Sequence, residues 1–249
     1  MPPIYDAIYF APHLDDVALS CGGQIFEQGA AGRQLLIVTV MAGRPPAGAF
    51  SPFAQIQHDK WGLSAAEAVN SRQAEDRAAC QLLGVAYDHW PFSDCIYRRH
   101  PQTNEPLYAS EEAIFGAVQE AEAKLMAQIA AKMNDLPRSG RVFAPLAIGN
   151  HVDHQLTRRA AEMAFGQGLS YYEDYPYNQR LYPAGDLPPP SPLIPQLWPL
   201  SRPAIQARLS AIAAFQSQLA SLFGDTQTMQ HLVQQHLAQL GGERNWLQP

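Results

Sequence analysis

The sequence predicts an α/β domain with a mostly parallel sheet. Short apolar runs alternate along the chain with longer segments of helical pattern, as in successive βαβ units. The apolar runs are continuous, as in "LLIVTV", which is typical of strands that helices cover on both faces. A first strand, helix and strand fit within residues 4–42, the length of one right-handed crossover unit.

The elements of this first unit can be assigned in order. Residues 4–10, "IYDAIYF", are rich in β-branched and aromatic side chains and predict a strand. A polar turn follows, and "VALSCGGQIFEQGAAG" then predicts a helix that ends at Gly29 or Gly32. Residues 34–42, "QLLIVTVMA", predict the next buried strand.

The middle of the chain continues the alternation. We expect an irregular loop over residues 44–62 and a helix over 64–84, closed by Gly84. Residues 85–92, "VAYDHWPF", predict another strand, and 94–109 contain scattered polar groups typical of a loop.

A long amphipathic helix is expected over residues 110–136, with Ser110 as its N-cap and acidic residues in its first turn. Residues 141–148, "RVFAPLAI", predict a further buried strand, and 151–168 pass from a loop into a helix. Residues 169–177, "LSYYEDYPY", predict a late strand.

The last part of the chain begins with a proline-rich segment. Residues 183–203 contain eight prolines, which exclude regular helix and internal strand and predict a surface loop, with a lid near a substrate site as the alternative. Residues 203–223 and 226–240 look helical. With no internal repeat or composition break, we predict one Rossmann-like, three-layer domain over 1–249, with helices on both faces of the sheet and C-terminal helices over 204–249.

Composition limits the possible partners. The 249 residues are 47% hydrophobic, enough for a sizeable core, and the formal charge of −6 gives no electrostatic reason to bind nucleic acid or anionic membranes. "MPPIYDAIYF" has no signal-peptide pattern, and no apolar run approaches the ~20 residues of a membrane span. We expect a cytoplasmic protein with reduced thiols, and the oligomeric state stays open.

Two clusters of polar residues each follow a predicted strand. They are His13-Leu14-Asp15-Asp16, after the first strand, and His151-Val152-Asp153-His154, after "RVFAPLAIGN". Ligand sites in such sheets lie at the carboxyl ends of strands, so we expect the clusters to meet. Imidazole and carboxylate groups together are the ligands expected for Zn²⁺ or a similar transition metal.

The spacing within the clusters suggests different roles. His13 and Asp16 are three apart across a tight turn and can face one point, so the adjacent Asp15 must point elsewhere. His151 and His154 can share one face of a helix start. Three protein ligands with one open position are typical of catalytic zinc, and an unligated carboxylate nearby could take a proton from the attacking water.

The histidines could also have purely structural roles. Either cluster alone could be a polar turn or a helix cap with exposed side chains, but both together, each after a buried strand, favour a site. The remaining histidines have no partner pattern, and we expect them in the core or on the surface; they are His58, His89, His100, His231 and His236.

The clusters also carry a family resemblance. "PHLDDVALSCGG" resembles the AHPDDE-type signature of the LmbE-like (PIG-L) de-N-acetylases, and "PLAIGNHVDH" resembles their second signature. "SRQAEDRAACQLLGV" is similar to the family's intervening helix, and "YYEDYPY" and "AAFQSQLASLF" resemble late segments of one branch. The first signature departs from the family at Pro12, Leu14 and Val17, where Ala, Pro and Glu are usual.

The resemblance implies a zinc ion, or another divalent transition metal, held by His13, Asp16 and His154. It implies Asp15 as the general base for the attacking water. None of the departures in the signature removes one of these residues.

The resemblance also implies an oxyanion donor. His151 would polarise the carbonyl or stabilise the oxyanion, oriented by Asp153. Some relatives add a tyrosine two residues before this histidine, but that position is Gly149 here. The donor must then be His151, the metal, or a tyrosine from elsewhere such as Tyr172.

Substrate-facing residues are implied at two further positions. Arg72 would line the substrate site, where a guanidinium can bind sugar hydroxyls or an anionic group; a surface ion pair is the alternative. Asp94 follows "WPFS", where the family often places another substrate-facing residue. Glu173 and Asp174 could face the substrate or be solvated acids near a strand end.

The activity implied is hydrolysis of an N-acyl amide, usually the N-acetyl group of an amino sugar. One alternative is a metal-dependent sugar-nucleotide glycosyltransferase, but the chain has no glycine-rich phosphate cradle or basic cluster, and histidine ligands favour zinc over magnesium. A non-catalytic sugar-binding relative is the other, against which the intact polar set argues. The sequence does not name the substrate.

Overall fold

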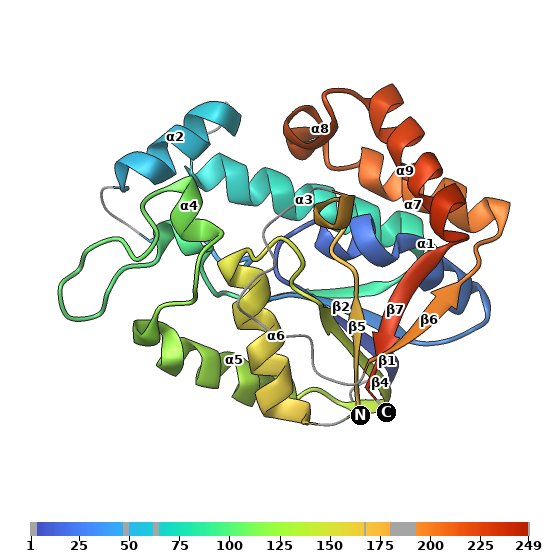
Figure 1. The fold of residues 1–249 in the computed structure, drawn as a ribbon, viewed down its shortest axis with the longest axis horizontal. Helices are drawn as coiled ribbons and strands as arrows, with labels where there is room; N and C mark the ends of the chain where they lie inside the picture. Colours follow the sequence, from blue (N-terminus) through green and yellow to red (C-terminus); the bar gives the residue numbers. More distant parts are fainter. Residues whose placement is uncertain (1–3, 47–49, 62–64, 167, 180–192, 249) are drawn as a thin grey trace.

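A seven-stranded sheet forms the centre of the computed structural model, which describes residues 4–46, 50–61, 65–166, 168–179 and 193–248 (Figure 1). Its strands, in the order β3-β2-β1-β4-β5-β7-β6, are β1 (Tyr5–Ala11), β2 (Leu35–Thr39), β3 (Ala86–His89), β4 (Arg138–Pro145), β5 (Leu169–Tyr172), β6 (Ile194–Trp198) and β7 (Glu243–Leu247). The pairings from β3 to β5 are parallel, and β7 runs antiparallel to both of its neighbours. The mostly parallel sheet is therefore confirmed.

Helices cover both faces of the sheet (Figure 1). They are α1 (Asp16–Ala30), α2 (Pro52–Trp61), α3 (Ala65–Leu83), α4 (Glu111–Ile114), α5 (Ala123–Asn134), α6 (Val152–Phe165), α7 (Arg202–Ala213), α8 (Gln216–Phe223) and α9 (Thr226–Leu240). Side chains of α1, α3 and α7 pack on one face, and those of α5 and α6 pack on the other. The three-layer arrangement expected from the sequence is confirmed.

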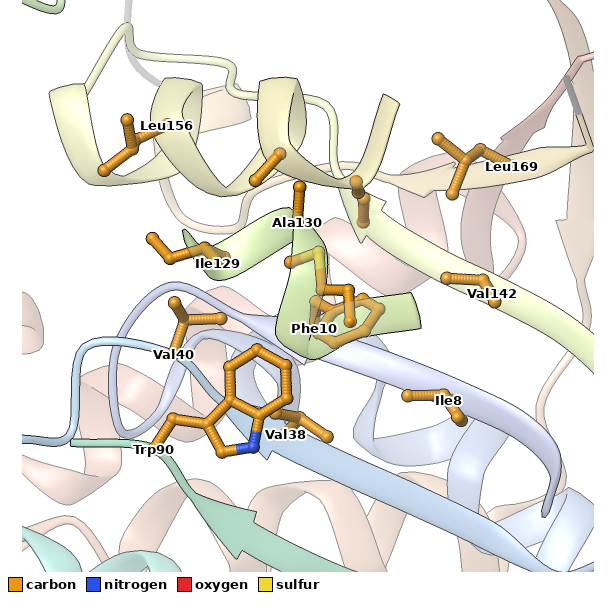
Figure 2. Packing of buried hydrophobic residues seen from close by; sticks show 14 of the residues in the cluster. Ile8, Phe10, Val38, Val40, Trp90, Ile129, Ala130, Val142, Leu156 and Leu169 are labelled. Atoms are coloured by element: carbon orange, nitrogen blue, oxygen red, sulfur yellow. The ribbon is translucent and has the colours of Figure 1, made fainter. Parts of the chain in front are cut away.

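Alternate residues of each central strand enter the two cores. On β1, Tyr9 packs toward α1 and α3, whereas Ile8 and Phe10 pack toward α5 and α6. Figure 2 shows this second core, where Phe10 lies close to Ile129 and Trp90. Burying a large apolar side chain fully contributes about 1.5–3 kcal/mol, so the continuous apolar strands are what two covered faces require.

An ion pair is inserted beside the middle of α1. Glu243 of β7 accepts hydrogen bonds from the backbone N–H groups of Gly23 and Gln24, each at 2.8 Å. Arg208 of α7 donates to the carbonyl of Leu19 and lies 3.2 Å from Glu243. A Cβ at Gly23 would lie 2.3 Å from a methyl of Leu200, so this glycine allows the close approach of the C-terminal elements.

Two segments differ from the sequence expectation in the middle of the chain. Residues 52–61 of the expected loop form α2, while 47–49 and 62 lie outside the described residues. The expected helix over 110–136 is interrupted between α4 and α5, although Ser110 caps α4 as expected. The carbonyls of Phe115 and Gly116 accept side-chain hydrogen bonds from α6 and the turn before it, and these tertiary contacts replace helical ones.

The C-terminal part also contains elements that were not expected. Within the proline-rich segment, 194–198 form β6, an edge strand that accommodates a proline; residues 183–192 lie outside the described residues. The helix expected over 203–223 is divided into α7 and α8, the one expected over 226–240 is confirmed, and β7 was missed. None of the helices in the described ranges has the length and apolar character needed to cross a bilayer.

Candidate functional site

The two polar clusters meet at the centre of the sheet. β1 and β4 are adjacent, and the strand order reverses between them because the chain has already passed through β2 and β3 on the other side. Such a switch point leaves a crevice at the carboxyl ends of the strands. The ring of His13, after β1, lies 4.9 Å from that of His151 and 5.4 Å from that of His154, centroid to centroid.

Asp16 joins the two halves of the site. Its Oδ2 accepts a hydrogen bond from the backbone N–H of His13 at 2.7 Å. The same oxygen lies 3.4 Å from His13 Nδ1 and 3.4 Å from His154 Nε2. His13, Asp16 and His154 therefore converge as the sequence predicted.

His154 has the surroundings of a metal-ligating imidazole. Its Nδ1 lies 2.6 Å from Asp174 Oδ1, and Asp174 Oδ2 accepts from the N–H of Ile148 at 2.9 Å. A carboxylate on Nδ1 fixes the proton there and leaves the Nε2 lone pair free to bind a metal. That Nε2 atom is buried and makes no hydrogen bond, which a metal ion would explain.

His13 is held in the same way from its other side. Its Nε2 lies 3.0 Å from Asp153 Oδ2, which also accepts from the N–H of Cys95 at 3.0 Å. The other Asp153 oxygen lies 2.5 Å from Arg98 Nη1. The carboxylate of Asp153 thus orients His13, whereas the expected link to His151 runs through the backbone N–H of Asp153.

His151 is arranged as a hydrogen-bond donor. It caps α6, and its Nδ1 accepts from the backbone N–H of Asp153 at 3.3 Å, so Nε2 carries the proton. Burial and the neighbouring His13 hold the pKa of His151 well below its usual range, which keeps the ring neutral. A nitrogen of His151 also lies within 4.8 Å of ring nitrogens of His13 and His154, so these three histidines could hold a metal ion as well.

Asp15 and Asp16 are adjacent but have different environments. Asp15 has a backbone φ of 139°, a strained value for a residue with a side chain. Burial raises the pKa of Asp15 to about 7, opposed by the Arg72 guanidinium. For Asp16, His154 and His13 outweigh the effect of burial and hold the pKa below its usual range. Two carboxyls with separated pKa values are typical of a proton-transfer site.

A cleft of about 660 Å³ opens over these residues. Asp15, Asp16, His13 and His151 lie along it, together with Arg72 and Asp94. Both expected substrate-facing residues therefore reach the cleft.

The contacts of Arg72 and Asp94 tie both of them to the site. Arg72 Nη2 lies 3.6 Å from Asp15 Oδ1 and donates to the carbonyl of Leu14 at 3.3 Å. Asp94 Oδ2 lies 3.7 Å from His13 Nε2.

The aromatic residues near the cleft correct one expectation. Tyr172 is fully buried and its hydroxyl donates to the carbonyl of Phe10 at 2.8 Å, so it is no oxyanion donor. Tyr177 lines the cleft instead, and its ring lies 5.6 Å from that of His154. A Cβ at Gly149 would lie 2.9 Å from Tyr177 Cβ, so Tyr177 occupies the space that a side chain at this position would need.

Sequence reasoning missed the contacts of Asp174 and Arg98. Asp174 is almost fully buried, neither substrate-facing nor solvated, and Glu173 contacts Arg244 and Trp246 of β7. Arg98 comes from a segment expected to be a loop, with no pattern that marks it. Only the odd placement of two acids after a buried strand was a signal for Asp174.

Other histidines and the thiols have structural contacts. His58 lies 2.7 Å from the hydroxyl of Tyr97, and His89 lies 2.7 Å from Asp76. The three cysteines are free and buried, as expected.

Comparisons with known proteins give a consistent result. The chain is 31% identical over 173 residues to a 2'-N-acetylparomamine deacetylase of Streptomyces fradiae, a match that covers 67% of this chain but only 56% of that protein. It is 30% identical over 190 residues to the enzyme of the same name from Niallia circulans, covering 70% of this chain and 68% of the relative.

Solved structures agree with these relatives. The zinc-inhibited form of teicoplanin deacetylase Orf2 superposes with a TM-score of 0.81 at 28% identity, covering 96% of each chain. The A40926 pseudoaglycone deacetylase Dbv21 gives a TM-score of 0.74 at 26% identity, covering 98% of this chain and 97% of that one. The model of the PIG-L, or GlcNAc-PI de-N-acetylase, family matches residues 8–165, which include every residue of the two signatures, and the chain belongs to this family.

Proposed function

We propose that this protein is a zinc-dependent hydrolase that removes the N-acetyl (N-acyl) group from an amino sugar in a small molecule or glycoconjugate. The observation that carries the proposal is the convergence of His13, Asp16 and His154 at one point, with Asp15 turned toward the cleft beside them. The similarity to deacetylases that are named for paromamine and teicoplanin supports the choice of an amino-sugar amide.

The ligand set fits zinc. Two imidazoles and one carboxylate, with positions left for water and substrate, are the donors of a catalytic zinc site. Bound there, the metal supplies Lewis-acid polarisation of the amide carbonyl and lowers the pKa of water. Asp174 and Asp153 keep both imidazoles oriented for this task.

Asp15 is the proposed general base. Its carboxyl has a pKa of about 7, which suits a group that must take up and release a proton near neutral pH. Asp15 removes a proton from the attacking water, and the water oxygen bonds to the carbonyl carbon. The proton then passes to the nitrogen as the C–N bond breaks, which yields acetate and a free amine.

His151 is the proposed oxyanion donor. Its Nδ1 is engaged by the backbone N–H of Asp153, so the proton is on Nε2, which lies 4.0 Å from Cys95 Sγ on a ring that lines the cleft. A preorganised donor of this kind contributes about 2.7–4 kcal/mol to transition-state stabilisation.

The cleft residues that we expect to contact the substrate include both charged and apolar side chains. Arg72 and Asp94 can bind sugar hydroxyls, and Ile96, Ile114 and Leu222 add apolar area. We therefore expect an amino sugar joined to a further organic group.

The test is amine release from a panel of N-acetylated sugars, with 2'-N-acetylparomamine and N-acetylglucosamine conjugates included, alongside metal analysis of the purified protein. Stoichiometric zinc with release of amine and acetate in equal amounts is expected. Zinc and tight sugar binding without turnover would instead identify a binding protein, and sugar transfer from a nucleotide donor would identify a glycosyltransferase.

A further inference from the structure

A second, smaller cavity adjoins the catalytic cleft. It is the smaller of the two spaces, and its walls include Leu14, Met41 and Val69. Arg72 and Asp94 line both spaces, so the small cavity is a neighbour of the catalytic cleft.

We propose that this cavity is the acyl subsite, which receives the methyl group of the N-acetyl substituent and limits the length of the acyl chain. The assignment rests on the proposed function and extends it by stating which acyl groups the protein accepts. Leu14, Met41 and Val69 are then the residues that determine acyl specificity.

The position of the cavity supports this assignment. Arg72 lies 3.6 Å from the carboxylate of Asp15, and Asp94 lies 3.7 Å from His13. An amide carbonyl attacked by a water at Asp15 has two substituents, the nitrogen that bears the sugar and the carbon of the acyl group. The two spaces share Arg72 and Asp94 as lining residues, so we infer that a carbonyl held beside these residues directs one substituent toward each.

The character of the two spaces decides which substituent each receives. The cleft is open and carries Asp15, Asp16 and His151 on its walls, as a hydroxylated sugar requires. The small cavity is lined by the apolar residues Leu14, Met41, Ala42 and Val69 and by Gly43, with Tyr97 beside the shared Arg72 and Asp94. A methyl group gains by leaving water for such a space, whereas a sugar would lose its hydrogen bonds there.

The walls of the cavity are firmly placed. Leu14 and Met41 are buried, and Met41 follows β2 and donates its N–H to the carbonyl of Pro12 at 2.9 Å. A Cβ at Gly43 would lie 2.4 Å from the carbonyl oxygen of Pro91, so the two backbone segments pack closely there. A rigid wall is what discrimination by chain length needs.

The assignment also explains Leu14, where the family signature usually has proline. Its carbonyl accepts the Arg72 hydrogen bond, as any residue there could. Its side chain adds apolar surface to the small cavity.

The test compares kcat/KM for acetyl, propionyl and butanoyl amides of the amino sugar on which the wild-type protein shows turnover. Val69→Ala and Met41→Ala enlarge the cavity and should shift the preference toward the longer acyl groups by about tenfold or more, since one methylene in an apolar pocket changes kcat/KM by roughly 10–200-fold. Val69 is half-buried on the side of α3, so Val69→Ala tests the idea even if the buried Met41→Ala variant does not fold.

Leu222→Ala is the matched control, because Leu222 is an apolar residue of the cleft that does not line the small cavity. It should leave the ratio between acyl groups unchanged. If wild type is active but Val69→Ala keeps the wild-type ratio, or Leu222→Ala shifts it as much, the acyl assignment is wrong while the proposed function stands. If wild type releases no amine from any acetyl amide of the panel, both fall.

Discussion

At the scale of single residues, the site depends on which of the neighbouring carboxyl and imidazole groups carries a proton. Asp15 and Asp16 are consecutive, yet the backbone at Asp15, with φ 139°, turns one carboxylate toward Arg72 and leaves the other between two imidazoles. His154 and His13 each have a carboxylate on the nitrogen that faces away from Asp16. The proposed base, Asp15, and the proposed ligand, Asp16, are therefore kept apart although they are adjacent in the sequence.

Replacing Asp15 tests the proposed base. Asp15→Asn keeps a side chain that tolerates positive φ, removes the base, and should lower kcat by about 10²–10⁴-fold while zinc content stays stoichiometric. Steady-state kinetics and metal analysis check this, with Asp135→Asn, an exposed residue after α5, as the control. Near-normal turnover of Asp15→Asn would remove Asp15 from the mechanism.

The pH profile provides a separate check. Asp15 acts deprotonated, and its pKa is raised to about 7 by burial, so kcat/KM should decline as pH falls through the folded-state pKa. A dication at Asp16 lowers the pKa of its neighbour, which places the acidic limb at or below pH 7 in the zinc enzyme. The residual activity of Asp15→Asn should not show this decline at acidic pH. If the decline is unchanged, a group other than Asp15 causes it.

Asp174 should act on the metal through His154. Asp174→Asn removes the negative charge beside His154 Nδ1. The change should weaken zinc binding by about 10–100-fold, measured by competition with a chromogenic chelator. Glu173→Gln is the control, since Glu173 contacts Arg244 and Trp246 instead. Equal affinities for both variants would show that the Asp174 contact does not tune the site.

At the scale of elements, the segment between β3 and β4 supports the site from behind. Arg98, after the short 3₁₀ turn Cys95–Tyr97, pairs with both Asp153 and Glu122. Tyr108 donates to Glu122 at 2.5 Å. The break in the expected helix over 110–136 thus lets buried Glu122 reach Arg98, the cation that also pairs with Asp153, which holds His13.

Loss of Arg98 should leave two buried carboxylates without their shared cation. Arg98→Met should reduce the free energy of unfolding by about 3–5 kcal/mol and weaken zinc binding, as measured by urea denaturation and chelator competition. The adjacent Arg99→Met, whose guanidinium donates to the backbone carbonyl of Asn104 at 2.8 Å, should do neither. Matching losses in the two variants would contradict the proposed role.

At the scale of the whole molecule, the metal would connect the two halves of the sheet. His13 and Asp16 follow β1, and His154 follows β4. A ligand that binds only the folded protein stabilises it by about 2.7 kcal/mol at a concentration of 100 times its Kd.

Zinc should therefore raise the Tm, and a chelator should lower it. Differential scanning calorimetry of the metal-free and zinc-loaded protein measures the shift, and Asp16→Ala should reduce it strongly. A shift of the same size in Asp16→Ala would place the stabilising zinc elsewhere.

The fold and the meeting of the two polar clusters were predictable for a local reason. Parallel strands place their carboxyl ends at one sheet edge, so polar residues directly after "IYDAIYF" and "RVFAPLAI" had to meet. The partners of Asp153 and His154 could not be predicted this way, because Arg98 and Asp174 reach them through tertiary contacts without a periodic pattern. Helical periodicity across 115–119 was misleading, since contacts from α6 outweighed it.

The place of β7 has a consequence for the order of folding during synthesis. All the proposed metal ligands precede residue 155, yet Glu243 of β7 is bonded to α1, the helix that begins at Asp16. A growing chain that has just made His154 lacks the strand that lies between β5 and β6. The helix that begins at the proposed ligand Asp16 thus gains its last contacts only after nearly ninety further residues have been added, and a nascent chain would bind zinc weakly until then.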